Sequence, residues 1–243
     1  MPDIIAKAAW DAAWLPERKL HIEGFGLVRD FTDRSLWGNQ HVWGGGGSVV
    51  VQVVPKFLDF QASGAVGRGI GRYGAGGLSD AAIAISGAPL PVAERMILIG
   101  AIMHPTDMTD VYGFAGGEFQ NSNPQYYGVP NLAAPRSPLL VVAGYGNPFY
   151  SNWGCNVENE FANNGTNVGA VATLTGACSG NTKSLRQATG GLWHTFYAGP
   201  AGKLKVGLQY SYAKKDGFWS FLGGAPSTSE SQVLTSVRYY PFD

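Results

Sequence analysis

Hydrophobic and polar residues alternate along several segments of the chain with a period of two. Between Lys203 and Ala213, every second residue is apolar or aromatic, and the residues between them are polar or small. The apolar set is Leu204, Val206, Leu208, Tyr210 and Tyr212. The segment after Phe57 repeats this alternation as far as Gly67. The pattern predicts β-strands with one apolar face, and about ten residues is the length that a tilted strand needs to cross a bilayer.

The C-terminal residues from Gln232 to Asp243 also predict a strand, because they show no helical period and close on aromatic side chains. Aromatic residues gather where the strands of outer-membrane β-barrels meet the bilayer surface. We therefore expect this segment to complete a sheet inside a lipid bilayer.

The connections between predicted strands alternate between short and long. Nine segments are predicted strands: 3–12, 19–31, 42–54, 57–68, 93–104, 110–120, 186–198, 203–214 and 231–242. The short connections carry Pro or Gly, as turns do, and the long ones are rich in Gly, Asn, Ser and Pro. The long ones are 32–41, 69–92, 121–185 and 215–230. This order predicts an all-β fold, an antiparallel up-and-down transmembrane β-barrel with turns on one side of the membrane and loops on the other.

Two segments depart from the simple pattern. In 19–31, the apolar residues change face between Ile22 and Phe25, and a β-bulge at a glycine there would explain the change. Within the longest connection, the apolar stretches 139–142 and 168–173 suggest an extra hairpin outside the membrane.

The amino-acid composition is compatible with two classes of β-protein, a transmembrane barrel and a soluble sandwich. Charged residues make up 14% of the chain, against roughly 25% in soluble domains, and 35 of the 243 residues are Gly. No apolar run approaches the roughly 18 residues of a membrane-spanning helix. These values fit a transmembrane barrel, but a Gly-rich soluble β-sandwich has a similar composition. The formal net charge of zero gives no basic field for nucleic acid, so we expect no nucleic-acid partner.

Several stretches of the chain resemble the C-terminal barrel region of Gram-negative outer-membrane proteins, some of them porin-like. The stretches are 25–34, 144–148, 225–228 and 238–242. The resemblance implies location in the outer membrane, contact with its lipid, recognition of the last strand by the barrel-assembly machinery, and scope for homo-oligomers. In such barrels the assembly signal usually ends on an aromatic residue, whereas here Asp243 follows Phe242.

Two cysteines, Cys155 and Cys178, lie in the longest polar segment. Two thiols close together in a loop favour a disulfide in an oxidising compartment. We therefore expect residues 1–243 to form one β-barrel domain, or the C-terminal portion of one, with a disulfide-tied extracellular loop at about 121–185.

Motifs for catalysis and cofactors are weak. Gly69, Gly71 and Gly74 match a dinucleotide-binding spacing, but the following residues offer too short a helix for the pyrophosphate, so a Gly-rich extracellular loop is the preferred interpretation. The histidines (His21, His41, His104 and His194) lack metal-ligand spacing, and no G-x-S-x-G elbow is present. We expect no cofactor, no metal and no enzymatic activity.

The polar faces of the strands carry the functional prediction. Ten side chains are expected to face a lumen: Lys7, Asp11, Glu23, Arg29, Asp59, Gln61, Glu118, Lys205, Gln209 and Arg238. A charge turned toward lipid would cost roughly 2–4 kcal/mol at mid-membrane, which favours the inward orientation. Mixed charges in a lumen line a channel or form ion pairs that plug a small barrel.

Three functions remain open from sequence. The first is a porin-like passive channel or a surface-exposed membrane protein without catalysis. The second is a secreted soluble β-barrel or sandwich that acts as a binding module, and the third is an outer-membrane hydrolase. Nine strands is an odd number, whereas single-chain bacterial barrels have an even one. We therefore expect either that the chain is part of a larger barrel or that a tenth strand lies within 69–92 or 121–185.

Overall fold

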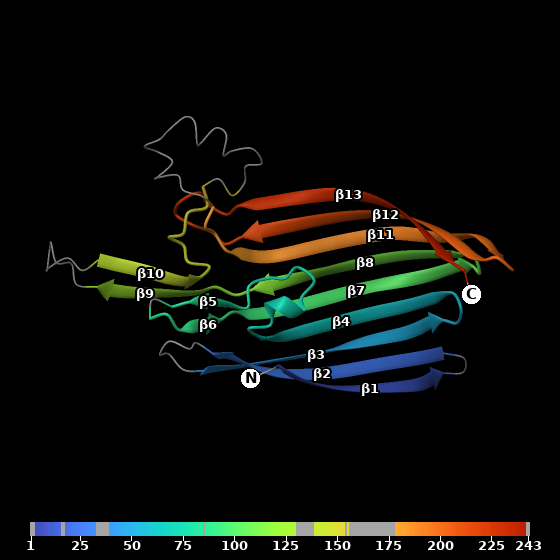
Figure 1. Cartoon of the computed structure of the whole chain (residues 1–243), viewed down its shortest axis with the longest axis horizontal. Coiled ribbons are helices and arrows are strands. Elements are labelled where there is room, and N and C mark those ends of the chain that lie inside the picture. Colours follow the sequence, from blue (N-terminus) through green and yellow to red (C-terminus); the bar gives the residue numbers. More distant parts are fainter. Residues whose placement is uncertain are drawn as a thin grey trace, which may run out of the picture.

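A nine-stranded antiparallel sheet dominates the computed structural model (Figure 1). The structure describes residues 3–15, 18–32, 39–84, 86–129, 139–153, 155 and 178–241. In order across the sheet, the strands are β1 (Ile4–Leu15), β2 (Arg18–Thr32), β3 (Asn39–Val54), β4 (Leu58–Arg68), β7 (Ala93–Thr106), β8 (Thr109–Gln120), β11 (Thr182–Gly199), β12 (Gly202–Gly217) and β13 (Ser227–Tyr240). Sheet order follows chain order, so the topology is up-and-down.

Each of the nine predicted segments overlaps one strand of this sheet, and each pair of neighbouring strands is antiparallel. The predicted all-β, up-and-down fold is therefore confirmed. In Figure 1 the short turns lie at the right end of the sheet and the longer connections, with their small hairpins, at the left. We call these the turn end and the loop end. No helix in the described part of the chain is long and apolar enough to cross a membrane.

The described residues do not close the sheet into a barrel, because β1 pairs with β2 alone and β13 with β12 alone. Four further strands occur in the long connections: β5 (Ala81–Ile83), β6 (Pro89–Pro91), β9 (Asn123–Val129) and β10 (Leu139–Tyr145). They pair as β5–β6 and β9–β10, apart from the main sheet. The expectation of a tenth sheet strand in either connection is therefore wrong for the described residues. Whether the chain is part of a larger barrel stays a prediction.

Two local predictions need correction. The register between β1 and β2 runs without a shift from Ile4–Val28 to Ala13–Lys19, so no bulge lies at Gly24 or Gly26. Phe25 and Leu27 simply point to the opposite face from Ile22 (see below). The expected hairpin in the longest connection does contain 139–142, but its partner is β9. Residues 168–173, the expected partner, lie outside the described residues.

Strand register gives the sheet two chemically different faces. Trp10 pairs with Ile22 and Ile22 with Val49, and paired residues share a face, which we call the apolar face. Its large side chains are exposed: Trp10, Ile22, Trp43, Val66, Ile97, Ile99, Leu208, Tyr210, Val233 and Val237. The other face, which contains Glu23 and its neighbours Ser48 and Ser63, we call the pocket face. The buried core is small, and it includes Leu27, Val42, Ile70 and Val92 near the loop end.

Candidate functional site: the pocket face and the loop folded over it

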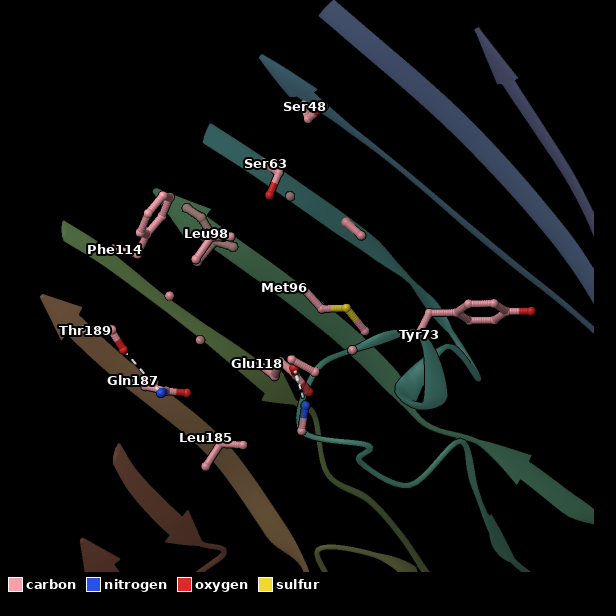
Figure 2. Close-up of a pocket in the computed structure, with 18 of the residues that line it drawn as sticks. Ser48, Ser63, Tyr73, Met96, Leu98, Phe114, Glu118, Leu185, Gln187 and Thr189 are labelled. Atoms are coloured by element: carbon pink, nitrogen blue, oxygen red, sulfur yellow. Dashed lines mark hydrogen bonds between the residues drawn. The ribbon is translucent and has the colours of Figure 1, made fainter. Parts of the chain in front are cut away.

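A cavity of about 640 Å³ lies on the pocket face. Its lining comes from strands β2 to β12 and from a segment of the β4–β7 connection, so the sheet is concave on this side. Figure 2 shows Ser48, Ser63, Met96, Leu98, Phe114, Glu118, Leu185, Gln187 and Thr189 along this wall. Apolar and uncharged polar side chains make up most of the lining, and its carboxylates are Glu23 and Glu118.

The strand register places all ten predicted lumen residues on the pocket face. Glu23, Glu118 and Gln209 line the 640 Å³ cavity. Asp11 and Asp59 line a second cavity of about 600 Å³, which also includes Lys19 and His21 near the turn end. The ten residues thus share a face but do not form one cluster. Whether this face borders an aqueous lumen stays a prediction.

One charged cluster joins β1 and β2. Lys7 Nζ lies 2.6 Å from Glu23 Oε1, and the His21 ring lies between two carboxylates. Its Nδ1 is 2.7 Å from Asp11 Oδ1 and its Nε2 is 2.9 Å from Glu23 Oε1. Three predicted residues, Lys7, Asp11 and Glu23, therefore meet in one cluster, which also includes His21, a residue outside the predicted set.

A second charged cluster joins β4, β7, β8 and β12. His104 Nδ1 lies 2.7 Å from Asp110 Oδ1, and His104 Nε2 lies 3.5 Å from Asp59 Oδ2. Lys205 Nζ lies 3.9 Å from Asp110 Oδ2. His104 and Asp110 are not among the predicted lumen residues, and metal-ligand spacing does not identify them. The parity of alternation was the signal that could have found them, since it places both on the face of Asp59.

Arg238 belongs to neither cluster. Its guanidinium lies 4.2 Å from the centre of the Trp193 ring on β11, a cation–π contact across β12. The contact holds this charge close to the sheet, near the free edge that β13 forms.

The first part of the β4–β7 connection, residues 69–80, folds onto the pocket face and is called here the inner loop. It begins at Gly69, whose φ of 67° suits glycine and where a Cβ atom would lie 2.5 Å from the Phe31 ring. A single 3₁₀ turn, η1 (Gly71–Tyr73), follows. This turn is far shorter than the helix that dinucleotide binding requires. The segment is a Gly-rich loop, as expected, but it lies against the sheet.

Asp80 fastens the inner loop to β2. The Arg29 side chain is 4% exposed, and its Nη1 donates to Gly69 O at 2.8 Å and to Asp80 Oδ2 at 2.9 Å. Asp80 Oδ2 also accepts from Arg72 Nε at 2.6 Å. That hydrogen bond raises the pKa of Arg72 above its usual value. Arg29, predicted to face a lumen, is instead buried beneath this loop.

Glu118 holds the middle of the inner loop against β8. Gly76 N donates to Glu118 Oε1 at 2.8 Å, as the dashed line in Figure 2 shows. A Cβ atom at Gly74 would lie 2.4 Å from Glu118 Oε2, and one at Gly76 would lie 2.6 Å from the Leu185 side chain. The glycines therefore allow the backbone to approach the sheet closely. In Figure 2 the Tyr73 ring points away from Glu118, and its hydroxyl donates to Asp3.

A third set of contacts surrounds Gln120 at the end of β8. Its Nε2 donates to Ser79 O at 2.8 Å and to Glu94 Oε2 at 2.9 Å, and its Oε1 accepts from Tyr145 of β10. Burial raises the pKa of Tyr145 to about 12. Gln120 thus links the inner loop to the β9–β10 hairpin.

Cys155 and Cys178 form a disulfide, as the sequence predicted. The chain beside it is anchored to the loop end of β12, because Asn152 Nδ2 donates to Phe218 O and to Gly224 O, each at 2.7 Å. The disulfide therefore ties the base of the longest connection next to the sheet.

Comparison with protein-family models gives no match, and comparison with curated proteins gives none either. Among solved structures, the chain is similar to the crystal structure of the outer membrane channel DcaP of Acinetobacter baumannii, with a TM-score of 0.60. The two chains share 13% sequence identity, and the similarity covers 98% of this chain and 54% of the channel chain. This chain thus spans about half the length of the channel it matches. At this identity the likeness concerns the fold: the sheet is of the kind found in an outer-membrane channel.

Proposed function

We propose that the protein is an outer-membrane β-barrel protein that acts as a porin-like passive channel, without catalysis. In this proposal the apolar face contacts lipid and the pocket face lines the aqueous path. The inner loop narrows that path, since it lies over the pocket face between β2 and β8. The proposal also includes recognition of the last strand by the barrel-assembly machinery and the formation of homo-oligomers. Both rest on the sequence resemblance to outer-membrane barrels.

The observation that carries the proposal is the apolar face. Large hydrophobic side chains are exposed on it from β1 to β13, with fractions such as 60% for Trp10 and 69% for Val233. A soluble sandwich would cover such a face with a second sheet. A face of this extent, opposite a polar one on the same strands, is what a bilayer-spanning sheet requires.

A sheet in lipid also needs partners for both edges, because unpaired backbone groups cost several kcal/mol each in hydrocarbon. The edges of β1 and β13 that are free among the described residues must therefore each pair with a strand in the membrane. Closure of β1 onto β13 and pairing with other strands both satisfy this requirement.

Extraction and conductance test the proposal together. The protein should stay in the membrane fraction through a high-salt wash and dissolve in detergent, and the purified protein should give conductance steps in planar bilayers. Release into the aqueous fraction would instead support the soluble binding module.

Cysteine labelling tests which face borders water. Gln209 lines the cavity and Leu208, its neighbour in β12, lies on the apolar face. In vesicles, Gln209→Cys should react with a charged, membrane-impermeant thiol reagent, and Leu208→Cys should not. The two native cysteines are bonded to each other, so they give no background. Equal reaction of both variants would contradict the assignment of the faces.

A further inference from the structure

Positive charge on the apolar face gathers at the loop end. Alternation and register place four basic side chains on this face: Arg68 on β4, Arg95 on β7, Arg186 on β11 and Lys214 on β12. Arg95 pairs with Val66 and therefore directly adjoins an apolar side chain of this face, whereas Arg186 pairs with Lys214. We call these four residues the cationic band.

The cationic band spans five adjacent strands, and its four residues come from four of them, since β8 contributes no cation. Arg68 and Arg95 are diagonal neighbours, Phe119 of β8 pairs with Arg95, and Arg186 follows on β11. Arg186 and Lys214 both contact Asp216, whose side chain is 22% exposed. Arg68 and Arg95 are exposed, and neither forms an ion pair within the described part of the chain.

The turn end of the same face is different. Among the described strand residues there, alternation places one cation on the apolar face, Arg18 at the first position of β2. Other strands carry apolar or aromatic residues at this end of the face, as at Leu58, Met103 and Tyr239. The two borders of the apolar face therefore differ in charge as well as in loop length.

We propose that the cationic band binds the phosphate groups of phosphorylated lipids in the leaflet on the loop side. The inference rests on the proposed function, which brings the apolar face against lipid. Arginine forms bidentate hydrogen bonds with phosphate, and its aliphatic stem can lie along apolar surface while the head reaches the headgroup layer. Arg68 and Arg95, which have no carboxylate partner among the described residues, provide the strongest contacts. In a bilayer with phosphorylated lipid in one leaflet only, the cationic loop end of the face would meet that leaflet and the turn end would meet the other.

The test compares two double variants that lose the same charge at opposite ends. Arg68→Gln with Arg95→Gln removes the unpaired half of the cationic band. Arg18→Gln with Lys56→Gln removes two cations at the turn end and serves as the control. Each purified protein, in a neutral detergent, is titrated with diphosphoryl lipid A, with lipid A stripped of its phosphates, and with inorganic phosphate, and binding is followed by native mass spectrometry. Far-UV circular dichroism verifies that each variant keeps its strands.

The band variant should bind diphosphoryl lipid A about 30-fold more weakly than the wild type, because each basic residue at an anionic lipid surface contributes roughly fivefold. The control should bind within about twofold of the wild type, and the dephosphorylated lipid should not distinguish the three proteins. Equal losses of affinity in both double variants would show that only the net charge matters and would overturn the proposal. The proposal would also fail if the wild type bound dephosphorylated lipid A as tightly as diphosphoryl lipid A. Inorganic phosphate that competes at the same concentration would also overturn it, in favour of a free-anion site. Failure of the proposed function is distinct, since the wild type would then be soluble without detergent.

Discussion

Leu98 and Ile99 are neighbours in β7 and are almost equally exposed, at 45% and 46%, yet they point to opposite faces of the sheet. Leu98 lies among glycines, Glu118 and Gln187 in the cavity of the pocket face. Ile99 lies opposite Ala62 and Ala115, and Ile97 and Val66 are exposed on the same face toward the loop end. Exposed area alone therefore does not tell which medium a side chain meets, and the surrounding side chains have to supply that information. Four experiments test whether the two faces meet different media.

A charge placed at each of these two positions gives the largest expected difference. In lipid vesicles, Ile99→Lys should lower the free energy of unfolding by about 4 kcal/mol, the upper end of the range for a Lys at the membrane midplane. Leu98→Lys should lower it by less than about 1 kcal/mol, because the ammonium group can remain hydrated in the cavity. Urea titrations followed by tryptophan fluorescence measure both. Equal costs would mean that both faces meet water, and the membrane assignment would fail.

Removal of the disulfide tests whether the orientation of the two faces depends on the covalent tie at the loop end. The double variant Cys155→Ser with Cys178→Ser should lose about 3 kcal/mol of stability, the loop-closure contribution of the disulfide in the chain-entropy model. The loss should appear as a lower free energy of unfolding in urea titrations. The longest connection should also be cleaved faster by proteases, while the labelling of Gln209→Cys and Leu208→Cys stays unchanged. A change in that labelling pattern would show that the sheet depends on the disulfide. Titration of the unreduced, denatured wild type with a thiol reagent should find no free thiol.

Loss of the Asp80 carboxylate should free the inner loop from the pocket face. Asp80→Asn weakens charge-assisted hydrogen bonds to Arg29 and Arg72, which should destabilise the docked loop by about 2 kcal/mol. We expect higher single-channel conductance and faster proteolytic cleavage within 69–80. Asp107→Asn, at an exposed turn position, is the matched control and should behave as the wild type. Unchanged conductance in Asp80→Asn would remove the loop from the conducting path.

A methyl group under the inner loop should have the smallest effect. Gly74→Ala places a Cβ atom 2.4 Å from Glu118 Oε2, and the shift that follows should cost about 1 kcal/mol. Gly26→Ala, on the apolar face, has no atom within 4 Å of the added Cβ and should be neutral. Conductance and thermal stability distinguish the two variants. A similar loss in Gly26→Ala would indicate that the apolar face is covered by protein.

Alternation in the sequence predicted the nine strands and the shared face of the ten polar residues, because both depend on the period of two. The inner loop could not be predicted in this way. Its position depends on contacts such as Arg29–Asp80, which join residues 51 apart, and glycine spacing alone does not specify them. The phase change at Phe25 predicts a bulge only if apolar residues are confined to one face of β2. In fact Leu27 is buried under the loop, so the pocket face is apolar there.

The longest connection, between Gln120 and Thr182, sets the order in which the sheet can assemble. Most neighbouring strands are joined by tight turns or moderate loops, so their hairpins can form from local contacts within microseconds. The β8–β11 pair must close over residues 121–181, and closure entropy grows with the logarithm of that length. Once Cys155 is bonded to Cys178, the covalent path between the two strands bypasses residues 156–177. An oxidised chain therefore has a shorter loop to close than a reduced one, and the disulfide should speed the joining of the two halves of the sheet.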